Sequence, residues 1–318
     1  MRALILALLL ATAAEADTAN VVQTHIRPGY AAFAAATNNF AALDSCDPAT
    51  LRPAFHAAYD AWLGVAHLSQ GPAEEEGRAL AILFWPDPKA LGWKAQRALL
   101  AGSPDSLTLE AMSDQSVAAR GLSGLERLLY PTDPLPADPC PLIHATAEDL
   151  ARMARDLVIE WGPYGDLLLT AGQPDNPRFL TKDEATQALF TQLITGLDYI
   201  ADRRLGRPLG TFDKPRPDLA EARASDRSLR NVILSLQALR DLALQLTPES
   251  PRTLAAFVQT LLLANELSDP SFAHITDPQA WLKLQILQQS IRTIRDAALA
   301  EIGPALGVTL GFNAQDGD

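Results

Sequence analysis

Apolar residues recur at steps of three and four along almost the whole chain, and no stretch alternates apolar and polar residues as a strand does. Steps of three and four place side chains on one face of an α-helix, whereas a half-buried strand needs a period of two. The clearest run, in residues 228–246, is Leu229, Val232, Ile233, Leu236, Leu239, Leu242 and Ala243. The chain is therefore predicted to be all-α.

Proline and glycine clusters separate the predicted helices. These helices cover residues 17–43, 47–68, 89–101, a segment ending at Tyr130, 142–170, 181–204, 228–246, 251–267 and 277–301. The best domain boundary is the polar segment from Gly172 to Pro177, because Gly and Pro interrupt helices in linkers. We predict a helical bundle over residues 17–172, a linker over 173–180 and a second bundle over 181–318. The two halves suggest a pseudo-repeat, although no residue-level repeat supports it.

The first 16 residues resemble a secretory signal peptide. A single Arg precedes a short apolar run, and small residues follow at Ala14 and Ala16. That run is too short to span a bilayer as a mature helix, and no later stretch is long and apolar enough. We therefore expect an exported mature chain that starts at Asp17 and has no transmembrane segment.

The chain contains two cysteines, Cys46 and Cys140. An even pair in an exported protein predicts one disulfide bond. A bridge that closes so long a loop stabilises the fold by up to about 4–5 kcal/mol on the chain-entropy model. Metal or redox chemistry by this pair is the alternative.

The formal net charge is −12, and no cluster of Lys and Arg occurs. This balance argues against nucleic acid or an anionic lipid surface as a partner, because both need basic patches. It is compatible with a cationic ligand, and equally with an acidic surface that only keeps the protein soluble.

One predicted helix carries two polar residues beside a leucine face. Leu122, Leu125 and Leu128 follow the helical step, and Pro131 should end the helix at about Tyr130. Ser123 and Glu126 are three residues apart, so they project from the same side. A carboxylate is seldom buried without a partner. Glu126 is therefore either solvated or paired, or it binds a ligand.

The segment Gly121-x-Ser123-x-x-Glu126 resembles the Gly-x-His-x-x-Glu signature of imelysin-like proteins, which are bacterial envelope proteins linked to iron uptake. Ser123 stands where that family usually has His. Four further segments resemble Gram-negative members of the family: Gln70–Pro72, Phe84–Asp87, Glu221–Asn231 and Gly311–Asp318. The resemblance therefore covers nearly the whole mature chain.

This resemblance implies two helical bundles that face each other across a cleft, in a periplasmic protein of the cell envelope. It also implies a binding or accessory role in iron acquisition. We expect no enzymatic activity, because Ser123 replaces the His of the family signature and the ligands that a zinc peptidase needs are missing. We expect the cleft around Ser123 and Glu126, with Arg78, Asp87 and Arg230 as further candidates. Glu126 is the candidate metal ligand, since hard cations such as iron prefer oxygen donors. The expected partners are a metal ion or an iron-containing ligand, and an envelope protein.

Two alternatives remain open. A zinc peptidase needs about three protein ligands and an open coordination position, and Ser is a poor substitute for His. No His-Glu-x-x-His occurs, and His56 and His67 lie about 16 Å apart along a helix, too far to share an ion. We interpret His25 and His144 as surface or capping residues. The second alternative is an interaction protein without a ligand.

In that second alternative, Glu126 pairs with Arg78 or Arg230 and only makes the interface between the halves more rigid. A buried carboxylate needs a partner whether or not a ligand exists.

Overall fold

The computed structural model describes residues 17–308. Helices fill most of this range, and the only β-type pairing within it is an isolated bridge between Thr211 and Lys214. The predicted all-α class is confirmed. The predicted signal peptide and the segment Gly311–Asp318 lie outside the described residues.

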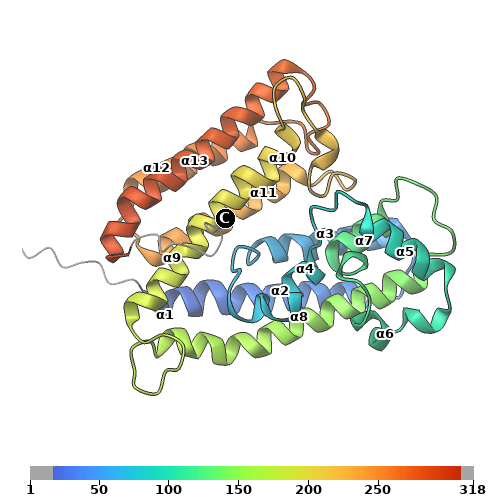
Figure 1. Cartoon of the computed structure of the whole chain (residues 1–318), viewed down its shortest axis with the longest axis horizontal. Helices are drawn as coiled ribbons and strands as arrows, with labels where there is room; N and C mark the ends of the chain where they lie inside the picture. Colours follow the sequence, from blue (N-terminus) through green and yellow to red (C-terminus); the bar gives the residue numbers. More distant parts are fainter. Residues whose placement is uncertain (1–16, 309–318) are drawn as a thin grey trace, which may run out of the picture.

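Three long helical runs build the first half of the molecule (Figure 1). They are α1 (Thr18–Asn20) continued by the π-helical η1 (Val21–Ile26) and α2 (Arg27–Ala41), then α3 (Pro48–Leu63), and α8 (Cys140–Leu169). Helix α2 packs against both α3 and α8. Aromatic side chains fill this core, where the Tyr30 ring stacks on the Trp161 ring at 5.2 Å. We refer to residues 17–169 as the first helix set.

Short elements connect α3 to α8. They are η2 (Gly71–Ala73), η3 (Glu75–Gly77), α4 (Arg78–Ile82), α5 (Leu91–Ala101), η4 (Pro104–Leu107), α6 (Leu109–Ser113), η5 (Val117–Ala119) and α7 (Gly121–Leu129). Helix α7 stops before Pro131, with Tyr130 as its C-cap, as the sequence predicts. It packs its leucine face against α3 and α8, and this packing directs the opposite, polar side toward the second half of the chain.

The second helix set covers residues 182–308. It contains α9 (Lys182–Asp198), the π-helical η6 (Tyr199–Leu205), α10 (Gly206–Leu209), η7 (Pro217–Leu219), α11 (Ser228–Leu246), α12 (Pro251–Asn265) and α13 (Pro278–Leu306). Helix α13 packs on α12 and α9, and α11 packs on α9 and α12. Across the boundary, α11 also contacts η1 and α3.

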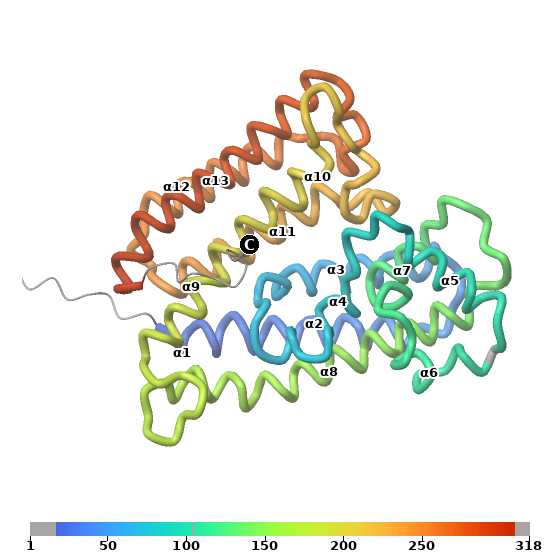
Figure 2. The backbone as a smooth tube through the Cα atoms, viewed as in Figure 1, coloured from blue at the N-terminus to red at the C-terminus, as the bar shows by residue number. Residues whose placement is uncertain are grey.

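An ordered turn joins the two sets at one end of the molecule, where the backbone reverses from α8 into α9 (Figure 2). The Asn176 side chain organises it: its Nδ2 donates to the Leu167 carbonyl, and its Oδ1 accepts from the backbone N–H of Arg178 and Phe179. Because contacts continue across the boundary, the division into two domains at residues 173–180 stays a prediction, as does the pseudo-repeat.

The predicted disulfide is confirmed. Cys46 and Cys140 are bonded, with their Cα atoms 5.3 Å apart and 94 residues of separation in the sequence. The bond links the segment before α3 to the first residue of α8. Over residues 17–308, no helix is long and apolar enough to cross a membrane.

Gly121 fixes the start of α7. It has φ +62°, and a Cβ built at this position would lie 2.2 and 2.3 Å from the carbonyl oxygens of Ala81 and Ile82 at the end of α4. Only glycine combines this left-handed backbone with so close an approach. Gly77 has a similar φ of +66°, but a Cβ added there would meet no atom within 4 Å.

We expect Gly121→Ala to reduce the free energy of unfolding by more than Gly77→Ala does. Both variants bear the backbone strain of about 1–2 kcal/mol, and only the first also clashes with backbone atoms, which cannot move aside cheaply. Urea denaturation followed by circular dichroism measures the difference. Equal losses in the two variants would contradict the packing role of Gly121.

Candidate functional site

The Glu126 side chain crosses from the first helix set to the second. Its Oε1 accepts hydrogen bonds from the backbone N–H of Ser225 at 3.0 Å and from the Ser225 Oγ at 2.7 Å. Burial raises the pKa of Glu126, and the two bonds from Ser225 oppose that rise. The expected pairing of Glu126 with Arg78 or Arg230 is therefore wrong. The partner of Glu126 is Ser225 in the loop before α11, and both of its donors are uncharged. Ser123 lies one turn earlier on α7 and is buried.

The other predicted site residues have partners of their own. Arg78 forms a two-pronged ion pair with Glu160 on α8 and donates to the Pro72 carbonyl. Both Asp87 carboxylate oxygens accept backbone N–H groups at the start of α5, at 2.8 Å each. Arg230 donates twice to Asp60 on α3. Arg78 and Asp87 thus hold the first helix set together, and Arg230 links the two sets.

A second carboxylate, Glu221, lies near Glu126. Glu221 is 2% exposed, and its Oε2 accepts from Arg204 Nε at 2.6 Å and from Asn231 Nδ2 at 3.1 Å. Its Oε1 is buried and has no hydrogen-bond partner among the described residues. The Glu221 charge also contributes to raising the pKa of Glu126. The two acids are therefore close enough for their charges to interact.

Two phenol groups lie near these acids. Burial raises the pKa of Tyr59 well above its usual value, and the charges of Glu221 and Glu126 raise it further. Burial followed by the charge of Glu221 raises the pKa of Tyr199 to about 12. The Arg204 guanidinium, which pairs with Glu221, lies 5.2 Å from the centre of the Tyr199 ring. Both phenols are neutral at pH 7.

Arg227 connects the start of α11 to α3. It is 1% exposed, its guanidinium lies 4.6 Å above the Tyr59 ring, and it is ion-paired with Asp60. Its Nη1 lies 2.8 Å from His56 Nδ1, and His56 Nε2 lies 2.8 Å from the Tyr130 hydroxyl. Because Arg227 only donates, His56 Nδ1 is the acceptor and its Nε2–H is the donor to Tyr130. Both ring nitrogens of His56 are thus engaged.

We call the residues that meet between the helix sets the interfacial polar cluster. It comprises His56, Tyr59, Asp60, Glu126, Arg204, Glu221, Ser225 and Arg227. It supplies carboxylate and phenol oxygens beside arginines, a donor set for a hard cation or for an anion that accompanies one.

Two cavities lie elsewhere in the second helix set. One of about 280 Å³ is lined by Asp269, His274 and Lys283, and one of about 380 Å³ is lined by Arg230 and Gln237. Neither is lined by Glu126 or Glu221. The cleft around Ser123 and Glu126 therefore stays a prediction.

Of the eight residues of the interfacial polar cluster, the sequence-predicted site contains Glu126 alone, and one histidine was misjudged. Tyr59 lies inside one predicted helix and Arg204 ends another, and the local pattern marks neither as part of a polar site. The interpretation of His25 as a surface or capping residue is wrong, because its Nε2 lies 3.0 Å from His67 Nε2. Helical periodicity can place a residue such as His25 on the inward face of its helix. It does not identify the residue that His25 contacts.

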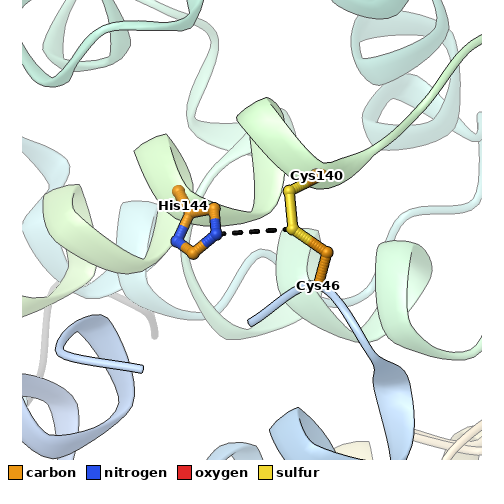
Figure 3. A group of neighbouring side chains, drawn as sticks. All are labelled: Cys46, Cys140 and His144. Atoms are coloured by element: carbon orange, nitrogen blue, oxygen red, sulfur yellow. Dashed lines mark hydrogen bonds between the residues drawn. A yellow bond between two sulfur atoms is a disulfide. The ribbon is translucent and has the colours of Figure 1, made fainter. Parts of the chain in front are cut away.

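The disulfide has a histidine neighbour, shown in Figure 3. His144 Nε2 lies 3.5 Å from the Cys46 Sγ, and the ligand atoms of Cys46, Cys140 and His144 lie within 4.8 Å of one another. A thiolate is the form of cysteine that binds metal. Because the two sulfurs are bonded to each other, neither is a thiolate. The disulfide instead joins the segment before α3 to the start of α8.

Comparison with known proteins relates the chain to one family. A family model described as imelysin, peptidase M75, matches residues 24–314. The chain is 27% identical over 187 residues to iron-regulated protein A of Synechococcus elongatus. That match covers 57% of this chain and 49% of the relative, so the chain spans about half the length of the curated relative that it matches.

Solved structures share the fold. An imelysin-like protein from Psychrobacter arcticum superposes with a TM-score of 0.76 at 19% identity, covering 93% of this chain and 96% of that chain. A putative iron-regulated protein A precursor from Parabacteroides distasonis gives a TM-score of 0.52 at 14% identity, covering 88% and 93%. At these identities the likeness shows the arrangement of helices alone.

The buried pair of Arg204 and Glu221 gives a first prediction. Arg204→Met should reduce the free energy of unfolding by about 3–5 kcal/mol, because it leaves a buried carboxylate without its compensating charge. The control is Arg292→Met, which breaks an exposed pair with Asp202 and should cost less than about 1 kcal/mol. Chemical denaturation of both variants measures the losses. A loss in Arg204→Met as small as the control's would contradict the role of the pair.

The raised pKa of Glu126 gives a second prediction. Because the folded state holds the proton more tightly than the unfolded chain, this group's contribution to stability is fully present below its unfolded pKa. That contribution is lost as pH rises through the folded pKa. Relative to Glu126→Gln, which cannot titrate, the wild type should therefore lose stability as the pH rises above the usual glutamate pKa of about 4. Thermal melts of both proteins across that range measure it, and parallel curves would contradict the raised pKa.

Proposed function

Because the chain belongs to the imelysin family, we propose that it is an exported, non-enzymatic binding or accessory protein of iron acquisition in the periplasm. Its ligand site is the interfacial polar cluster, with Glu126 and Glu221 as the oxygen donors and with Ser123 and Arg230 at its border. The ligand is an iron ion or a small iron-containing compound.

The unpartnered Oε1 of Glu221 carries this proposal. A buried carboxylate oxygen without a donor costs free energy, and native structures rarely tolerate one. A cation at this oxygen would offset the cost. Glu126 is close enough for the two charges to repel, and a shared cation would relieve that repulsion as well. The neighbouring phenol of Tyr59 adds a further oxygen donor that iron would favour once deprotonated.

The comparisons support the link to iron. The curated relative is named for its regulation by iron, and this chain shares 27% identity with it over 57% of its own length. An exported location agrees with the disulfide between Cys46 and Cys140, since disulfides persist in oxidising compartments. The predicted signal peptide over residues 1–16 supports the same location.

The cluster favours binding over peptide hydrolysis. A zinc peptidase needs imidazole or thiolate ligands around an open coordination position. His56 is the histidine of this cluster, and both of its ring nitrogens are engaged, by Arg227 and by Tyr130. Ser123 stands where the family has its histidine. The remaining donors are oxygens.

Titration of the purified protein with ferric nitrilotriacetate, followed by tryptophan fluorescence and by the visible absorption of iron–phenolate bonds, tests the proposal. We expect one iron per chain, with affinity lowered at least about 10-fold in Glu126→Gln and in Glu221→Gln. Glu160→Gln is the control, since that acid pairs with Arg78 in the first helix set. Its affinity should equal the wild type's.

Two results would contradict the proposal. One is the absence of iron uptake at micromolar concentration, and the other is unchanged affinity in both cluster variants. Cleavage of casein that a chelator stops and that Glu126→Gln abolishes would identify a metallopeptidase instead.

A further inference from the structure

A pair of histidines lies apart from the interfacial polar cluster. His25 belongs to the π-helical turn η1, and His67 follows the end of α3. Their Nε2 atoms lie 3.0 Å apart. We propose that His25 and His67 bind a divalent first-row transition-metal ion, such as Zn²⁺, Cu²⁺ or Ni²⁺, where η1 meets α11. This site is separate from the iron site proposed above and does not rest on it.

The spacing of the two nitrogens fits ligation of one ion. Bonds from a metal to imidazole nitrogen are about 2.0–2.1 Å, so two such ligands at angles between square and tetrahedral are separated by about 2.9–3.4 Å. The separation of 3.0 Å lies within this range. The ring centroids are 5.1 Å apart and the ring planes are tilted by 48°, so the rings meet at their edges rather than stacking face to face.

A hydrogen bond alone does not account for the pair. One Nε2–H can donate to the other Nε2, but His67 Nδ1 is buried and has no partner among the described residues. It is unsatisfied in either tautomer, because one tautomer leaves an N–H and the other a lone pair without a partner. An ion bound at the two Nε2 atoms would fix Nδ1 of His67 as an N–H, and its binding free energy would stabilise the folded state.

Both imidazoles are in the form that binds metal. Burial lowers the pKa of His25, although Asp241 opposes the shift. Burial, followed by the charge of His25, lowers the pKa of His67 well below its usual value. At pH 7 both rings are therefore neutral, and protons compete weakly with a metal. Both residues are half-buried.

Helix α11 supplies a third ligand candidate, Asp241. Its charge acts on His25, and its Oδ1 accepts from Arg240 at 2.8 Å. No hydrogen bond to Asp241 Oδ2 is present in the part of the chain that the structure describes, so this oxygen can turn to an ion. One turn further along α11, Gln245 accepts from Asn20 at the start of the same helical run as His25. This contact holds α11 beside η1. Two imidazoles, one carboxylate and water make a donor set that suits Zn²⁺, Cu²⁺ and Ni²⁺.

Calorimetric titration with Zn²⁺ and visible absorption with Cu²⁺, on the full chain without its signal peptide, test the proposal. We expect one tight site, weakened about 100-fold in His25→Gln and in His67→Gln, and about 10-fold in Asp241→Asn. His274→Gln and Glu126→Gln are the controls and should leave the affinity unchanged. Absence of a tight site, or its persistence in both single histidine variants, would overturn the proposal.

A measurement on the wild type covers the case in which a histidine variant does not fold. Proton–nitrogen correlation spectra of the imidazoles should show two of the five histidines responding to one equivalent of Zn²⁺ through their Nε2 atoms. The responding signals should persist in the surface variants His144→Gln and His274→Gln. Loss of a responding signal in either of these variants, or no response at all, would overturn the proposal. Neither result bears on ferric iron binding, which depends on Glu126 and Glu221.

Discussion

Buried charges between the two helix sets are the constraint on which the rest of the structure depends. Arg227 enters the first helix set over Tyr59 and pairs with Asp60, and Glu126 reaches back to Ser225. Such groups are costly to bury unless each is paired or hydrogen-bonded, so the loop before α11 and the polar side of α7 specify each other's position. The disulfide joins two parts of the first helix set, the turn around Asn176 connects the two sets, and the buried charges link them face to face.

Periodicity predicted the helices well because each helix buries one continuous apolar face. The end of α7 at Tyr130 followed from Pro131, because proline acts on the backbone within a few residues. The Cys46–Cys140 bond could be predicted because the chain has no third cysteine. The iron-related family was predicted from short segments that keep their order along the chain.

The partners of the polar residues could not be predicted in the same way. Asp87 proved to be a helix cap, and Arg78 and Arg230 pair with Glu160 and Asp60. The Arg78–Glu160 pair spans 82 positions of the sequence, and the Arg230–Asp60 pair spans 170. The local sequence pattern cannot identify partners that are so far apart. The same limit hid the contact between His25 and His67, which the structure alone brings together.

The two proposed sites differ in donor chemistry: carboxylate and phenol oxygens between the helix sets, and imidazole nitrogens where η1 meets α11. The central claim is that the contact between the helix sets holds an iron ligand, and diffraction at the iron absorption edge tests it most directly. In crystals equilibrated with ferric nitrilotriacetate, the account predicts an anomalous peak within coordination distance of the Glu126 and Glu221 carboxylates. A map with no peak there, or with iron only on exposed acids such as Glu74 and Glu75, would contradict it.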